Sequence, residues 1–416
     1  MPDIPRLPDI DSSLALLSEG YPFIANRCQR LGTDVFQVRL LMQDTICMSG
    51  EEAAKLFYDD TLFQRQQAAP RMLQKTLFGQ GGVQGLDDAA HLHRKRLFMS
   101  LLSEEAVTEL VHLTERYWME AIPDWQRSER ITLLPEVQAI LTRAVCEWAG
   151  VPLASDDVML RRDQLAALID GAGGIGARHW KARKARRETE QWIGSLIAKV
   201  RDNSLSIEAG RALAVVSRHR EADGQLLDEK TAAVEVLNLL RPTVAVSRFI
   251  VYAAMELLAH PDWRVRLDRD DSMLEAFAQE VRRLHAFFPF TAAKVRTDFE
   301  WRGYHFPKGT RVLLDLYGTN RDERLWEQPD AFRPERFTEW NGGAFNFITQ
   351  GGGDAATGHR CPGEPLSIAL LMTAVRMLTR RMVYGVPAQD LRMDQSRMPA
   401  QPESLFIMAD VRPKDA

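Results

Sequence analysis

One cysteine lies where its thiol could bind a metal. Cys361 belongs to a glycine-dense loop, 351–364, which leads into an apolar helix predicted from Pro365 to Met382. Glycines allow tight turns and a close approach of the backbone to a large flat ligand. The helix dipole and the neighbouring His359 and Arg360 are expected to favour the thiolate, which is the metal-binding form. A cysteine that is merely a small buried hydrophobe would leave the loop around it unexplained.

A buried arginine is the second candidate for chemistry. An almost continuous helical pattern runs from Asp228 to His260, about 50 Å at 1.5 Å per residue, and such a helix usually crosses the centre of a large domain. It contains Arg241 and Pro242 among apolar neighbours, and the proline predicts a break and a kink at that point. Arg241 either reaches the surface to form a salt bridge or holds an anion in the interior.

The elements that must position these residues are mostly helices. Helical spacing predicts helices over 103–125 and 134–150, and a glycine-rich stretch at 171–176 is expected to connect two helices. Strand patterns are few and late: 299–306 and 310–317 are predicted to pair as a hairpin, with a weak pair from Leu391 onwards. No linker divides the chain, so we expect one domain over 1–416, mainly α with a small β portion.

Composition limits the classes of protein. Lys and Arg number 53 and Asp and Glu 57, a net charge of −4, which gives no support to a nucleic-acid binder. The basic run 178–187 is expected to be a solvated helix face. Four scattered cysteines do not form a disulfide framework, and we find neither a signal-like N-terminus nor a long uninterrupted apolar stretch. We therefore expect a cytoplasmic protein with no nucleic-acid partner and no membrane insertion.

Two further segments precede the cysteine loop. Glu280 and Arg283 stand three residues apart on one helix face, and the segment 332–337 (FRPERF) follows them. In this order, with the cysteine loop downstream, the chain resembles the cytochrome P450 superfamily of haem-thiolate enzymes over essentially its whole length. The resemblance implies the P450 fold, with the long central helix over the haem. It also implies haem b, Cys361 as the axial iron ligand, and a structural ion-pair network of Glu280, Arg283 and a later arginine.

The same resemblance implies cationic partners for the haem carboxylates. The candidates are His91 and Lys95, at the start of an early helix, and Arg65. Each of them could instead be an ordinary surface charge.

The chain departs from the usual family pattern at two places. Asp354 and Thr357 occupy loop positions where the family has Phe and Gly. In the central helix, Arg241 and Pro242 stand near the place of the acid–alcohol pair that delivers protons during O₂ activation. This replacement would disable conventional O₂ chemistry, unless the substrate supplies the missing carboxylate.

These departures resemble the fatty-acid peroxygenase branch of the superfamily, as do the segments 80–87 and 350–364. That resemblance implies hydroxylation of long-chain fatty acids at Cα, or at Cβ, with H₂O₂ and without a redox partner. Arg241 would hold the substrate carboxylate, which would act as the acid–base group, and Pro242 would shape the pocket.

Gln84 bears on the product. Alkene-forming members of the branch carry a histidine at its position, so Gln84 favours hydroxylation, and the likeness of 73–86 to an α-hydroxylating member favours C2. Phe78 complicates this, because decarboxylating relatives also have an aromatic residue there. Phe78, Phe287 and Phe288 are predicted walls of the acyl-chain site, or ordinary core aromatics. The alternatives are a decarboxylase giving terminal alkenes, a reductase-dependent P450 monooxygenase, and a non-enzymatic haem or fatty-acid binder.

Overall fold

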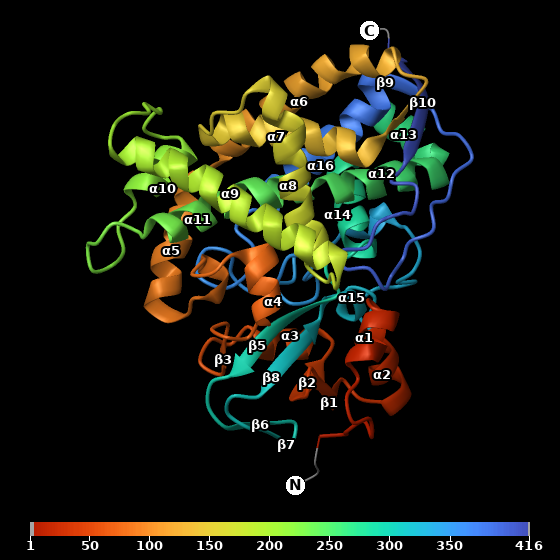
Figure 1. Cartoon of the computed structure of the whole chain (residues 1–416). Helices are drawn as coiled ribbons and strands as arrows, with labels where there is room; N and C mark the ends of the chain where they lie inside the picture. Colours follow the sequence, from red (N-terminus) through yellow and green to blue (C-terminus); the bar gives the residue numbers. More distant parts are fainter. Residues whose placement is uncertain (1–3, 415–416) are drawn as a thin grey trace.

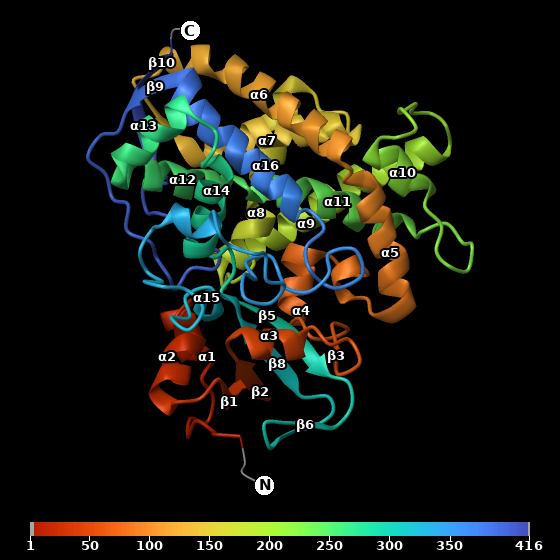
Figure 2. The ribbon, with the colours of Figure 1, turned by 180° about the vertical axis from the view of Figure 1, so that it is seen from behind.

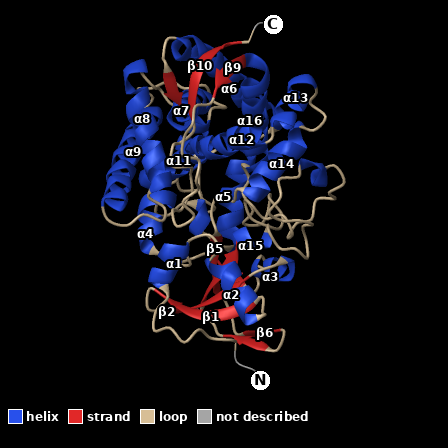
Figure 3. Ribbon diagram, turned by 90° about the vertical axis from the view of Figure 1, so that its right-hand side faces the viewer, coloured by secondary structure: helices blue, strands red, loops and turns tan. Residues whose placement is uncertain are grey.

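Helices make up about 52% of the chain in the computed structural model, which describes residues 4–414. Figures 1 and 3 show a helical body with strands gathered toward its two ends, one group near each terminus. The predicted fold class, mainly α with a small β portion, is confirmed. The prediction of a single domain over 1–416, like that of a cytoplasmic location, stays a prediction.

The helical body contains the long helices that the sequence pattern predicted. Ser103 caps the first of them, because its hydroxyl accepts a hydrogen bond from the Ala106 N–H at 3.3 Å. The 171–176 segment joins α8 to α9, as expected. The α-helices are α1 (Ser13–Glu19), α2 (Phe23–Leu31), α3 (Glu51–Phe57), α4 (Arg71–Leu73), α5 (Asp88–Leu101), α6 (Glu104–Gln126), α7 (Leu133–Ala149), α8 (Val158–Asp170), α9 (Ala177–Arg201), α10 (Ala212–Arg218), α11 (Glu229–Ala245), α12 (Ser247–Ala259), α13 (Pro261–Arg269), α14 (Leu274–Leu284), α15 (Leu316–Thr319) and α16 (Glu364–Arg376).

Two larger sheets and one hairpin make up the β portion. A five-stranded sheet has the order β1-β2-β8-β5-β3, a three-stranded sheet has the order β4-β10-β9, and β6 pairs with β7. The strands are β1 (Val35–Leu40), β2 (Gln43–Met48), β3 (Phe63–Gln64), β4 (Arg130–Thr132), β5 (Phe290–Val295), β6 (Phe299–Trp301), β7 (Tyr304–Phe306), β8 (Arg311–Asp315), β9 (Met382–Gly385) and β10 (Ile407–Pro413).

The predicted strands are wrong in two respects, their pairing and their place in the chain. The hairpin lies wholly within 299–306, closed at Gly303, and β8 pairs instead with β5 (antiparallel) and β2 (parallel). Strands are also not confined to the second half of the chain, because β1 and β2 lie near the N-terminus. Strand partners are chosen by long-range packing, which local alternation does not specify.

The central helix is interrupted later than predicted. Pro242 lies inside α11, and the break between α11 and α12 falls at Val246. At this break the Val246 N–H donates to the Thr243 carbonyl at 3.2 Å, a hydrogen bond that spans three residues where an α-helix spans four. A proline removes only one helical hydrogen bond, and here the flanking core holds the helix together around it.

Glu229–Ala259 is long and apolar enough to cross a membrane by length and composition, but 72% of its most apolar window is buried inside the protein. Its side chains join those of α7, α9 and α16 in the largest apolar core cluster. This segment therefore serves as a core helix, which agrees with its predicted place in the middle of the domain.

Candidate functional site

The cysteine loop is folded tightly on itself beside α16. The Cys361 N–H donates to the Gln350 carbonyl at 3.0 Å. Gly351 has φ +100°, and a Cβ there would lie 3.2 Å from Arg360 Cα, so only glycine fits. Figure 2 shows the loop lying between the start of α16, α5 and the five-stranded sheet. The half-buried Cys361 thus sits just before the N-terminus of α16.

The free thiol of Cys361 does not behave as the helix dipole alone would predict. Burial raises its pKa, and the Gly363 N–H and Lys95 only partly oppose this. The flanking cations are committed elsewhere: Arg360 pairs with Glu364 at 2.6 Å, and the His359 ring lies 3.7 Å from Asp87. A bound metal would itself displace the proton, since a coordinating thiol is deprotonated.

The Glu280 network is present, and its Glu280–Arg283 pair is fully buried. Arg283 donates to both carboxylate oxygens of Glu280, at 2.6 and 2.8 Å, and both side chains are wholly inaccessible to solvent. Arg336 adds a bond at 3.1 Å, so the later arginine of the 332–337 segment is the third member. Each charge has a partner, as burial requires.

Arg282, which the sequence pattern did not single out, ties α14 to the cysteine loop. Its guanidinium binds Glu364 and donates to Thr349 Oγ1 at 3.0 Å and to Gln350 Oε1 at 2.9 Å. Arg282 and Arg283 are neighbours on α14 but hold different segments: Arg282 holds the cysteine loop, and Arg283 takes part in the Glu280 network with the 332–337 segment.

Replacing Glu280 by glutamine should lower the free energy of unfolding by about 3–5 kcal/mol, because it leaves two buried guanidinium groups without a counter-charge. The exposed Glu335→Gln variant is the matched control and should stay within about 0.5 kcal/mol of the parent. Urea denaturation of the haem-loaded proteins, followed by circular dichroism, measures both. Equal losses in the two variants would contradict the structural role of Glu280.

The three predicted haem-carboxylate partners lie around the cysteine loop. Lys95 donates to the Gly358 carbonyl at 2.9 Å and to the Arg360 carbonyl at 2.5 Å, so it braces the loop. The His91 ring stacks on His359 with centroids 4.0 Å apart. Burial, His359 and Lys95 lower the pKa of His91 to about 3, so at neutral pH it offers a neutral N–H rather than the expected cation.

Arg65 has a buried guanidinium nitrogen without a hydrogen-bond partner. Its side chain is 7% exposed, and Nη2 donates to the Phe57 carbonyl at 3.2 Å while Nη1 is buried without a partner. This buried guanidinium nitrogen is a donor available to an added anionic group, such as a haem carboxylate.

Arg241 is buried in the interior and makes no surface salt bridge within the described residues. It is 6% exposed, and its Nη1 donates to the Leu77 carbonyl. Burial and the nearby Arg186 lower the pKa of Arg241 to about 9, while Cys361 and Glu235 act in the opposite direction. Arg241 therefore stays protonated at neutral pH, within electrostatic reach of the cysteine, and the surface-salt-bridge interpretation is wrong.

Arg186 was not predicted from the sequence. It is 4% exposed on α9 and donates from Nε to the Thr76 carbonyl at 2.9 Å and from Nη2 to the Leu77 carbonyl, the same oxygen that Arg241 uses. Burial lowers its pKa to about 10. The expected solvated face is therefore wrong at this position. Ala182, Ala185 and Thr189 share the buried face at helical spacing, which was the available signal.

A cavity of about 620 Å³ lies beside Arg186, between Lys75 in the short π-helical turn η1 (Gln74–Phe78), α9 and the start of α11. Cations outnumber acids in its lining, so the cavity attracts anions. Its charged lining residues are Lys75, Arg183, Arg186, Arg187, Lys230, Glu190 and Glu229.

Gln84 is held by a polar network on α11. Its Oε1 accepts a bond from Asn238 Nδ2 at 3.2 Å, and the same amide donates to Glu235 at 2.8 Å. Glu235 is fully buried, binds Arg94 at 2.6 Å, and has its pKa raised by burial. Glu235 was also missed, although a carboxylate in an apolar helix must find buried partners.

The predicted aromatic walls fall into two groups. Phe78 ends the η1 turn, next to the Leu77 carbonyl that both arginines bind. Phe287 and Phe288 pack edge-to-face with each other, at 4.9 Å, in the segment between α14 and β5, and Phe287 packs on Phe249 of α12 at 5.7 Å. All three are half-buried.

Comparisons with known proteins agree with this geometry. A profile described as cytochrome P450 matches residues 271–399. A solved variant of cytochrome P450SP alpha is 45% identical, covers 97% of this chain and all of its own, and superposes with a TM-score of 0.96. The chain belongs to the cytochrome P450 family.

Two further P450 structures superpose equally well. Cytochrome P450EX alpha, solved with myristic acid, is 44% identical over the whole of both chains with a TM-score of 0.97. Cytochrome P450 OleT, solved without ligand, is 32% identical, covers 99% of this chain and all of its own, and has a TM-score of 0.97. The P450 fold that the sequence predicted is thereby confirmed.

Membership of the P450 family makes the protein an oxidoreductase whose family uses a haem iron held by a thiolate. The residues present fit such a group. The loop supplies a half-buried thiol, its glycines permit close backbone approach, and Arg65 has an unsatisfied donor for a carboxylate.

Proposed function

We propose that this P450 is a fatty-acid peroxygenase, which hydroxylates long-chain fatty acids at Cα and less often at Cβ, with H₂O₂ and no redox partner. The observation that carries the proposal is the protonated, buried Arg241 in the central helix, joined by Arg186 at one carbonyl oxygen. Arg241 forms no salt bridge among the described residues, and the only carboxylate paired with Arg186 is Glu190, at the long distance of 3.7 Å. The two guanidinium groups together therefore favour an added anion. The myristic acid in the P450EX alpha structure supports a fatty acid as that anion.

Four residues are assigned to the cofactor, haem b. Cys361 is the iron ligand, Arg65 and His91 donate to the haem carboxylates, and Lys95 holds the loop that carries the ligand. When bound, the haem iron would accept the oxidising equivalents of H₂O₂ and transfer them to a C–H bond.

Arg241 binds and orients the substrate carboxylate. Its Nη1 donates a hydrogen bond to the Leu77 carbonyl. A substrate carboxylate would replace this neutral acceptor by a charged one, and the hydrogen bond to a charged acceptor is stronger. The Leu77 oxygen would keep its bond from Arg186. With the head group held, Cα and Cβ are the first carbons that can reach the reacting centre, which explains the proposed regiochemistry.

The bound carboxylate also moves a proton. Arg241 and Pro242 stand near the place where other P450 members carry the acid–alcohol pair that delivers protons. The substrate carboxylate bound to Arg241 would therefore be the base that accepts a proton from peroxide. Pro242 has no backbone N–H and shapes the helix next to the anchor. Gln84 is assigned a polar contact with the substrate, and Phe78, Phe287 and Phe288 are assigned to the acyl chain.

Mass spectrometry after mixing haem-loaded protein, myristic acid and H₂O₂, with no reductase present, tests the proposal. We expect 2-hydroxymyristic acid as the main product and 3-hydroxymyristic acid as the minor one. A terminal alkene one carbon shorter would favour the decarboxylase, and product only with NAD(P)H and a redox partner would favour the monooxygenase. A spectral change on adding the acid, without product, would leave a non-catalytic binder.

A further inference from the structure

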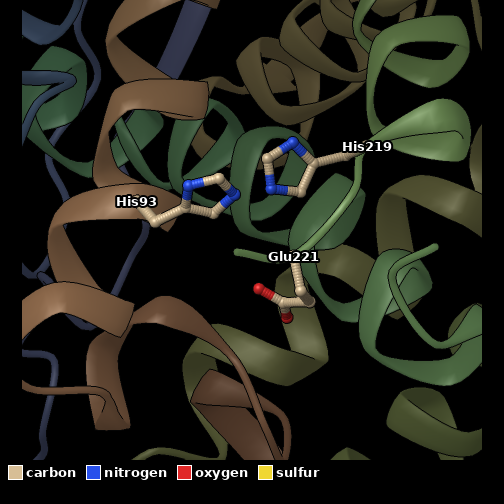
Figure 4. Close-up of side chains that lie close together, drawn as sticks. All are labelled: His93, His219 and Glu221. Carbon is tan, nitrogen blue, oxygen red and sulfur yellow. The ribbon is translucent and has the colours of Figure 1, made fainter. Parts of the chain in front are cut away.

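Two histidines and a glutamate converge at a place that plays no part in the site described above. His93 lies on α5, His219 follows the end of α10, and Glu221 lies two residues further on. One potential ligand atom from each residue lies within 4.8 Å of the other two. Figure 4 shows the two imidazole rings with one nitrogen of each turned toward the other, and the Glu221 carboxylate beneath them.

One of the two rings has a nitrogen that the protein itself leaves without a partner, and the other ring makes a single hydrogen-bond contact. His219 Nε2 is buried and has no hydrogen-bond partner. The rings of His93 and His219 have centroids 5.1 Å apart, and His93 Nε2 contacts the Arg220 carbonyl at 2.8 Å. A buried ring nitrogen without a partner, facing a second imidazole and a carboxylate, is unsatisfied unless something lies between them.

We propose that His93, His219 and Glu221 bind a divalent transition-metal ion, with Zn²⁺ as the reference ion. Imidazole nitrogen suits zinc, copper and nickel, and a carboxylate oxygen completes a three-ligand set of mixed nitrogen and oxygen donors. Such a set leaves a fourth tetrahedral position for water. The proposal does not depend on which substrate the haem site oxidises.

Closing the site around an ion needs a modest rearrangement. Ligands about 2.0–2.2 Å from a tetrahedral ion lie about 3.4 Å from one another. The three atoms lie within 4.8 Å of one another, so they must approach by up to about 1.4 Å. Glu221 belongs to a short surface hairpin, closed by its own N–H bond to the Gln225 carbonyl at 2.8 Å. A surface loop of this kind can adjust without disturbing the core.

Metal binding competes with one ion pair. Glu221 binds Arg94, and Arg94 also binds Glu235, which leads through Asn238 to Gln84. An ion at the site would share or displace the Arg94 bond to Glu221, while Arg94 keeps its fully buried partner Glu235. The neighbouring guanidinium opposes a second positive charge, so binding is expected to be weaker than at an isolated three-ligand site.

Calorimetric titration of the chelator-treated, haem-loaded protein with ZnCl₂ tests the site. We expect one zinc ion per chain at this site. The variants His93→Ala, His219→Ala and Glu221→Gln should each lower its affinity at least about tenfold, because even partners outside the ligand shell cost about 10–100-fold. His112→Ala, which removes an exposed histidine of α6, should leave the affinity unchanged.

Circular dichroism of each variant shows that a lost affinity is not a lost fold. Zinc affinity that is equal in all four variants would overturn the proposal, as would an equal loss in His112→Ala. Diffraction at the zinc edge then locates the ion, and an anomalous peak away from the three side chains would also overturn it.

Discussion

Arg241→Leu should abolish most peroxide-driven turnover of myristic acid. The variant loses both the anchor and the position of the acid–base group, and proton transfer by a positioned group is worth about 10²–10⁴-fold in rate. A hydrogen bond to a charged group is worth about 1.5–3 kcal/mol, so fatty-acid binding should weaken by about 10–150-fold. Product formation under saturating peroxide and the spectral titration with fatty acid measure the two effects separately.

The structure suggests that this variant will fold. Leucine suits the apolar neighbours Leu239 and Leu240, and the Leu77 carbonyl keeps its bond from Arg186. Arg241→Lys keeps the positive charge but loses the planar guanidinium group with its paired N–H donors, so its activity should fall between those of the parent and Arg241→Leu. Arg218→Ala, an exposed change on α10 outside the cavity, is the matched control and should turn over normally.

The substrate offers an independent control. Myristyl alcohol has the same chain as myristic acid without its carboxylate, so the parent protein should convert it far more slowly. The carboxylate mechanism would be wrong if Arg241→Leu kept near-normal turnover of the acid, or if the alcohol were converted as fast as the acid.

Cys361→Ser should remove thiolate ligation of the haem. A hydroxyl is a harder, more weakly binding ligand than a thiolate, and no other cysteine lies in the loop. We expect the spectral features of cysteinate-bound haem to disappear. Product formation should fall by at least about 100-fold, because the loss of a residue that only hydrogen-bonds to a metal ligand already costs up to about 100-fold. Absorption spectra of the reduced carbon monoxide complex and product analysis measure these outcomes.

Cys28→Ser is the matched control, because Cys28 is also a half-buried free cysteine but lies on α2. It should keep the parent spectrum and activity. If Cys361→Ser kept the thiolate spectrum, the iron ligand would have to be assigned to another residue, and the proposed role of the cysteine loop would fail.

Features that depend on short stretches of chain could be predicted from the sequence. The Glu280–Arg283 pair follows from helical spacing of three residues, and the structure forms it at 2.6 Å. The helix predicted from residue 103 also follows from helical spacing, and the structure caps it at Ser103. The cysteine loop and the apolar central helix are also continuous segments whose residue types indicate their environment.

Features that join distant segments were decided only by the tertiary structure. β2 pairs with β8 across more than half of the chain, so local alternation suggested the wrong hairpin. A basic run gives no sign of which arginine turns inward, and only packing of α9 on the η1 turn brings Arg186 to the Leu77 carbonyl. The convergence of His93, His219 and Glu221 likewise needs α5 to lie beside the loop after α10.

The sequence by itself therefore indicated the family, through its resemblance to the P450 superfamily, and singled out Cys361 and Arg241 as candidates for chemistry, because each lies in a continuous segment of distinctive residue types. The tertiary structure alone decided which charges are buried together. Burial removes solvation from a charge and forces it to find a partner, which can lie far away in the sequence: 141 residues separate Arg94 from Glu235, and 265 separate Lys95 from the Arg360 carbonyl.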